Sequence, residues 1–100
     1  MTKKTEKNSE QLKSIIDDWV SRLRVKPKLI RVQKMTRKWG SCSTLGTVTI
    51  ASDLSKKPRR FQEYVVAHEL LHLRVKNHSK LFQATMTAHF PGWRKVDLER

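Results

Sequence analysis

The sequence has little cysteine and no long apolar stretch. Its one cysteine, Cys42, excludes an intrachain disulfide. The opening residues 1–11, MTKKTEKNSEQ, contain no apolar segment of the kind that a secretory signal needs. No run approaches the roughly 20 apolar residues that span a bilayer. We therefore expect a cytoplasmic monomer with no membrane partner.

Acidic residues are also scarce, since 9 Asp and Glu stand against 22 Lys and Arg, for a formal net charge of +13. None falls between Trp19 and Ser52. The basic residues of that window are Arg22, Arg24, Lys26, Lys28, Arg31, Lys34, Arg37 and Lys38. A field of this sign attracts acidic partners, nucleic acid first, although a solvated surface explains the same charges.

Only three glycines and three prolines interrupt the chain, and no linker or repeat divides it. Its 100 residues therefore predict one domain over 1–100, with residues 1–8 as a disordered polar tail. A helix should start at Ser9 and end near Val25, before Pro27. The apolar residues at helical spacing in this segment are Leu12, Ile15, Ile16, Trp19, Val20 and Leu23.

The middle of the sequence predicts strands, and the last third predicts helices. Residues 29–35 and 47–50 have strand character on either side of a loop or hairpin connection over 36–46. Helical spacing resumes after Pro58 and continues to about Val75, and Ser79 can cap a further helix. The predicted fold is α+β: an N-terminal amphipathic helix, a small twisted sheet, a central helix and one or two C-terminal helices.

The central helix carries the segment His68-Glu69-Leu70-Leu71-His72. Four residues turn a helix by about 400°, so the two histidines share one face, roughly 6 Å apart along the axis. Two imidazoles placed in this way can bind one zinc ion. The carboxylate of Glu69 lies beside that position and can take a proton from a zinc-bound water. Two half-buried core histidines are the structural alternative.

A catalytic zinc needs a third protein ligand and an open fourth position. His78 follows His72 by six residues, and a continuous helix would carry it to another face. We predict that the helix ends at Asn77 in a left-handed conformation, so that the chain folds back and presents His78 to the metal. A surface histidine at a helix start is the alternative.

Other residues have both functional and structural interpretations. The Cys42 thiolate could reach a metal, or the residue could pack at a strand end. Trp39 could stack on a substrate, or pack in the core. The strand over 47–51 could be an exposed edge that binds an extended peptide, or an internal strand. Its residues proposed for substrate binding are Thr47, Val48, Thr49 and Ile50.

Four stretches of the sequence together resemble the YgjP-like metallopeptidases, a zincin family related to the SprT-like metalloproteases. The resemblance spans about residues 31–93. Its stretches are Thr36-Arg37-Lys38-Trp39-Gly40-Ser41-Cys42-Ser43, Gly46-Thr47-Val48-Thr49-Ile50, Tyr64-Val65-Val66-Ala67-His68-Glu69-Leu70-Leu71-His72-Leu73 and Asn77-His78-Ser79-Lys80-Leu81-Phe82.

This resemblance implies a minimal zincin-like domain with one zinc ion per chain. By the resemblance, His68, His72 and His78 are metal ligands and Glu69 is the catalytic base. The expected activity is zinc-dependent hydrolysis of peptide bonds. The alternative from a different class is a basic nucleic-acid-binding module with a structural or vestigial zinc site, in which the basic segment 22–38 and Trp39 form the contact surface.

Overall fold

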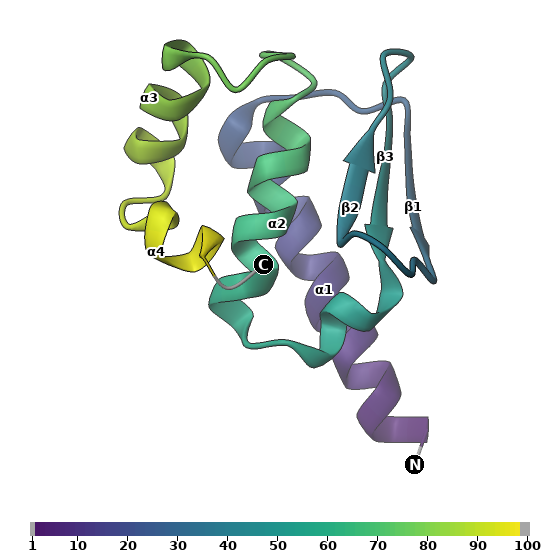
Figure 1. The fold of residues 1–100 in the computed structure, drawn as a ribbon. Helices are drawn as coiled ribbons and strands as arrows, with labels where there is room; N and C mark the ends of the chain where they lie inside the picture. Colours follow the sequence, from purple (N-terminus) through teal and green to yellow (C-terminus); the bar gives the residue numbers. More distant parts are fainter. Residues whose placement is uncertain (1, 99–100) are drawn as a thin grey trace.

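The computed structural model describes residues 2–98, with side chains described from Ser9 onward. The elements in chain order are α1 (Thr2–Leu23), β1 (Leu29–Gln33), β2 (Gly40–Cys42), β3 (Thr47–Ala51), the 3-10 helix η1 (Ser52–Lys56), α2 (Arg59–Leu71), α3 (Lys80–His89) and α4 (Trp93–Asp97). Figure 1 shows α2 in the middle, with the sheet on one side, α3 and α4 on the other, and α1 behind. The predicted α+β class is confirmed.

The first helix packs on α2 through the predicted apolar stripe, of which Leu12, Ile15 and Trp19 are each 1% exposed. The helix α1 begins at Thr2, so in the structure it includes residues 2–8, which the sequence assigned to a tail. Three lysines and a glutamate in that stretch favour helix, so the helix needs no cap at Ser9. Met1 lies outside the described residues.

The helix α1 ends in a left-handed turn at Arg24, whose φ is 54°. The Arg24 N–H donates to the carbonyl of Ser21, and the Val25 N–H donates to the carbonyl of Val20, both at 3.2 Å. This pair of bonds is the Schellman motif, which usually has glycine at the left-handed position. An L side chain there costs about 1–2 kcal/mol. The protein therefore has an arginine where its backbone favours a glycine.

The sheet has the strand order β1-β3-β2, with β1 parallel and β2 antiparallel to β3. The interpretation of residues 47–51 as an exposed edge strand is therefore wrong, because β1 and β2 occupy both hydrogen-bonding edges of β3. Its side chains Val48 and Ile50 are 0% and 1% exposed. The edge next to α2 is instead β2, which forms within the segment 36–46 and pairs with β3 as an antiparallel hairpin, one of the two connections predicted there.

The helix α2 is enclosed by its neighbours, and every residue from Phe61 to Leu71 except Glu63 is buried. It ends at Leu71, earlier than predicted. The following residues form tighter turns, with N–H to carbonyl distances of 3.0 Å from Leu73 to Leu70 and 2.9 Å from Arg74 to Leu71. Residue 77 has no positive φ, so the predicted left-handed cap there is wrong. Hydrogen bonds between residues three positions apart end the helix without a left-handed residue.

The chain then enters α3 at the predicted cap, where the Ser79 hydroxyl accepts the N–H of Phe82 at 3.4 Å. Gly92, with a φ of 83°, makes the tight turn that leads into α4. Both helices pack against α2 and complete its enclosure. Among the described residues, no helix has the length and apolar character that crossing a membrane requires.

Replacing Arg24 by glycine should stabilise the fold, because glycine adopts the left-handed turn without steric cost. We expect the free energy of unfolding to rise by up to about 1 kcal/mol, or roughly 4–8 °C in melting temperature. Thermal unfolding measures the change. The control Arg22→Gly lies in the last helical turn and should destabilise by about 1 kcal/mol. Destabilisation by Arg24→Gly would contradict the left-handed assignment.

Candidate metal centre

Three histidine rings meet at the C-terminal end of α2. His68 lies on the helix and is 7% exposed, His72 caps the helix, and the chain returns to place His78 beside them. The Nε2 atoms are 3.2 Å apart between His68 and His72, 3.2 Å between His72 and His78, and 3.1 Å between His68 and His78. The structure thus brings together the three histidines that the sequence singled out, in a group that could hold a metal ion.

The spacing of these nitrogens fits a small tetrahedral cation. Zinc–nitrogen bonds of about 2.0–2.1 Å in tetrahedral geometry separate two ligand nitrogens by about 3.3–3.4 Å. The observed separations of 3.1–3.2 Å agree closely with this value. Three histidines also leave one tetrahedral position open, as a catalytic metal site requires.

Hydrogen bonds on the opposite ring nitrogens direct two of these Nε2 lone pairs toward the shared centre. The Nδ1 of His72 lies 3.1 Å from the carbonyl of Val75, which can only accept, so this nitrogen carries the proton. Tyr64 donates its hydroxyl proton to the Asp97 carboxylate at 2.5 Å. The Tyr64 oxygen then accepts from the Nδ1 of His68 at 3.2 Å. Both Nε2 atoms are left unprotonated, as a metal ligand must be.

The hydrogen bonds of Tyr64 and Asp97 were not predicted from the sequence. Tyr64 stands one helical turn before His68 and is 0% exposed. Its ring stacks on that of Trp93 with the centroids 6.3 Å apart, so the residue also belongs to the core. Asp97 stands 33 positions after Tyr64, and no local pattern connects them. Only the packing of α4 on α2 brings the carboxylate to the hydroxyl.

The buried ring of Phe82 forms an apolar wall behind the three histidines. Its centroid lies 4.8 Å from that of His72, 5.0 Å from His78 and 5.2 Å from His68. Phe82 is 1% exposed and belongs to the first turn of α3. The Ser79 cap of that helix therefore positions both the wall and the neighbouring His78. An apolar wall limits the freedom of the rings and excludes water from one side of the centre.

The side chain of Glu69 is 5% exposed and lies against the edge strand β2. Gly40 makes this approach possible, because a Cβ atom at that position would lie 2.8 Å from the Glu69 Cγ and 3.1 Å from the Thr49 carbonyl. Gly40 belongs to one of the stretches that carry the family resemblance, but the need for glycine at this position becomes visible only in the packing of β2 on α2. The glycine provides the space that the carboxylate side chain occupies.

Cys42 lies on β2 near this carboxylate but is not part of the histidine group among the described residues. Burial, and secondarily the charge of Glu69, raise the pKa of the Cys42 thiol above its usual value. Its Sγ approaches the Ser43 carbonyl at 3.7 Å. These facts favour the packing interpretation of Cys42 over the thiolate ligand.

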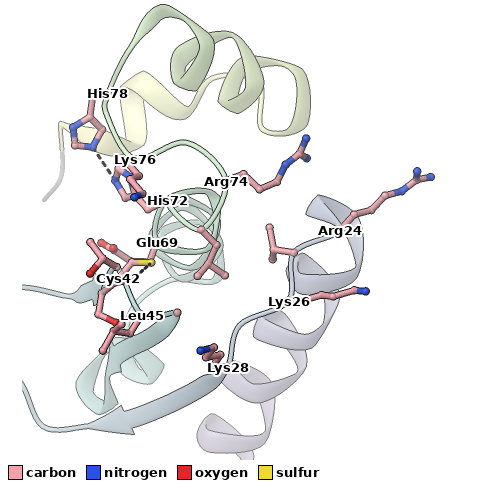
Figure 2. Close-up of a pocket in the computed structure, with 15 residues that line it drawn as sticks. Arg24, Lys26, Lys28, Cys42, Leu45, Glu69, His72, Arg74, Lys76 and His78 are labelled. Atoms are coloured by element: carbon pink, nitrogen blue, oxygen red, sulfur yellow. Dashed lines mark hydrogen bonds between the residues drawn. The ribbon is translucent and has the colours of Figure 1, made fainter.

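A cleft of about 740 Å³ opens beside the histidines, as Figure 2 shows. It runs between the C-terminal ends of α1 and α2 and the loop that joins β2 to β3. Glu69, His72 and His78 belong to its lining, so the candidate metal centre is accessible from solvent. The remaining lining residues are Arg24, Val25, Lys26, Lys28, Cys42, Ser43, Thr44, Leu45, Gly46, Leu73, Arg74 and Lys76.

Trp39 and the strand residues proposed for substrate binding do not line this cleft. Trp39 packs edge-to-face on Phe61 at 5.6 Å, near the opposite end of α2. The proposed peptide-binding role of Thr47, Val48, Thr49 and Ile50 loses its basis, since β3 is the paired central strand.

The substitution Gly40→Ala should disturb the fold through Glu69. The added methyl group has to displace either the Glu69 side chain or the paired backbone of Thr49, which we expect to cost about 1–3 kcal/mol of unfolding free energy. Denaturant unfolding measures this loss. The control Ser41→Ala, at the next position of β2, removes only a half-buried hydroxyl and should cost less. Equal stability of Gly40→Ala and the wild type would contradict the proposed role of Gly40.

The chain is similar in structure to the metallopeptidase zymogen jannalysin of Methanocaldococcus jannaschii, with a TM-score of 0.76 and 21% identity over 88% of this chain and 91% of that one. It is also similar to the zymogen abylysin of Pyrococcus abyssi, with a TM-score of 0.73 and 20% identity over 85% and 87%. No curated protein matches the sequence. The model of the family described as "YgjP-like, metallopeptidase domain" matches residues 3–99. The chain therefore belongs to the YgjP-like metallopeptidase family.

Proposed function

We propose that this metallopeptidase-family protein is a zinc-dependent peptidase with one zinc ion per chain. In this proposal His68, His72 and His78 hold the metal and Glu69 is the general base. The observation that carries the proposal is the convergence of three Nε2 atoms within 3.2 Å of one another. The Nδ1 bonds of His68 and His72 support it, because they fix the tautomers that metal binding requires.

The reaction divides its tasks between the metal and the side chain of Glu69. A bound zinc ion supplies a Lewis acid that polarises the scissile carbonyl and lowers the pKa of water to about 7. Glu69 takes the proton from the attacking water and returns it to the leaving amine. Its position in the lining of the same cleft as His72 and His78 suits this role. Its burial shields the proton transfer from bulk solvent.

The roles of metal ligand and general base should separate by mutation. We expect about one zinc per wild-type chain by elemental analysis, and loss of that zinc in His78→Ala. Glu69→Gln should retain zinc but lose peptidase activity by about 10²–10⁴-fold, since it removes only the base. His89→Ala, outside the histidine group, is the matched control and should keep both zinc and activity. Full activity in Glu69→Gln, or full zinc content in His78→Ala, would contradict the assignment.

The Tyr64 hydroxyl should contribute to zinc affinity without touching the metal. Tyr64→Phe keeps the ring that stacks on Trp93 but removes the oxygen bonded to the Nδ1 of His68. We expect zinc affinity to fall about 10- to 100-fold in competition with a chelator. Circular dichroism checks that the fold is kept. Asp97→Asn retains an acceptor oxygen and should lose less affinity. Wild-type affinity in Tyr64→Phe would show that the hydrogen bond does not act on the metal.

A further inference from the structure

The cleft beside the histidines has a strong excess of positive charge. Five of its lining residues are basic, and Glu69 is its one acidic residue. We refer to the five as the cleft cations: Arg24, Lys26, Lys28, Arg74 and Lys76. In the part of the chain whose side chains are described, no carboxylate forms an ion pair with any of them. Their charge is therefore available to a bound molecule.

Two of the cleft cations are held in place by the surrounding backbone. The stem of Lys28 lies over Gly46, where a Cβ atom would come within 3.2 Å of the Lys28 Cγ. The Lys28 N–H also donates to the Gly46 carbonyl at 2.9 Å. Arg74 donates from Nη1 to the Leu23 carbonyl at the end of α1, at 3.2 Å. These contacts fix the guanidinium of Arg74 and the base of the Lys28 side chain.

The cleft cations are distributed unevenly about the histidines. Figure 2 shows His78 and His72 at one end of the cleft with Lys76 beside them. Arg24, Lys26 and Lys28 lie beyond Glu69 at the other end, with the ends of Arg24 and Lys26 directed away from Glu69. Arg24 occupies the left-handed position at which glycine would be less strained. Three of the five cleft cations therefore come from the segment that follows α1, on one side of the candidate metal centre.

The lining of the cleft favours a polypeptide over a nucleic acid as its acidic occupant. Proteins that bind single strands stack bases on aromatic side chains as well as contacting phosphates. No Trp, Tyr or Phe residue belongs to the cleft lining. The lining instead adds the aliphatic residues Val25, Leu45 and Leu73 to the cations. Such a surface can contact the carboxylates of a peptide and the apolar side chains between them.

We propose that this cleft selects peptides with Asp or Glu residues on one side of the scissile bond. The inference rests on the proposed peptidase function, because it takes the histidines as the point of cleavage. Acidic side chains on that side of the peptide lie along the cleft cations, whereas basic ones are repelled. The side follows from the uneven distribution of the charges, and a peptide with its acidic residues on the other side gains little.

Peptides of equal length and composition provide the test on the zinc-loaded full chain. One set places a block of Asp and Glu before a central apolar segment, one set places it after that segment, and a third carries Lys in either position. We expect one acidic set to be cleaved with a kcat/KM at least about tenfold above its mirror arrangement and above the Lys peptides. The preference should shrink as salt rises from about 50 to 500 mM. Equal cleavage of all sets would overturn the proposal.

Charge reversal at Lys28 tests whether the cleft itself makes the selection. Lys28→Glu should lower kcat/KM for the preferred peptide by about tenfold and raise it for the Lys peptides. Lys28→Arg should keep the preference. The control Lys34→Glu makes the same change of net charge at an exposed position outside the cleft lining. If Lys34→Glu matches Lys28→Glu, overall charge rather than the cleft is responsible, and the proposal fails.

Binding separates failure of this inference from failure of the proposed function. Fluorescence anisotropy with the labelled peptides reports the acidic preference even if no peptide is cleaved. Preferential binding without cleavage would support the cleft inference and contradict the peptidase assignment. Cleavage without an acidic preference would support the peptidase assignment and contradict the cleft inference. A single-stranded DNA oligonucleotide that competes more strongly than the acidic peptide, with Lys28→Glu reducing its binding, would overturn the peptide proposal in favour of a nucleic-acid site.

Discussion

The enclosure of α2 is the constraint on which the rest of this domain depends. A helix buried from Phe61 to Leu71 needs neighbours on nearly every side, and α1, the sheet, α3 and α4 provide them. Polar groups are tolerated on such a helix only where hydrogen bonds or a ligand replace the lost water. His68 and Glu69 lie where α2 reaches the cleft, so they are shielded from bulk solvent but still accessible to a small molecule.

Hydrogen bonding explains why the histidines can serve a metal rather than merely fill space. The Val75 carbonyl and the Tyr64 hydroxyl each accept a hydrogen bond from a protonated Nδ1, which leaves Nε2 lone pairs on His72 and His68 that face one another at 3.2 Å. Two lone pairs at this separation repel each other, and a cation between them removes the repulsion. The Tyr64 hydroxyl and the Val75 carbonyl thus set the orientations of the His68 and His72 rings. Because both lone pairs then point to one centre, that centre favours a cation.

Features confined to one helix could be predicted from the sequence, and features that depend on distant partners could not. The spacing of His68 and His72 works within α2, and the apolar stripe of α1 follows helical periodicity, so both were predicted correctly. The β-branched residues of β3 suit an edge or a central strand equally, so the sequence left both positions open, and only the structure shows that β3 is central. The contact of Asp97 with Tyr64 and the space at Gly40 arise only when elements pack together.

The basic residues of the cleft and the residues of the candidate metal centre come largely from different segments of the chain. Arg24, Lys26 and Lys28 come from the link between α1 and β1, whereas His68 and Glu69 come from α2 and His72 from its C-cap. A positive field raises the local concentration of acidic molecules and speeds their encounter, but it does not by itself stabilise a transition state. In the proposed enzyme, a change in the link would therefore alter which peptides bind, while the geometry of the histidines would stay fixed by α2, Tyr64 and Phe82. Arg24 lowers the stability of the fold, since it adds charge at a position where glycine would give a more stable backbone.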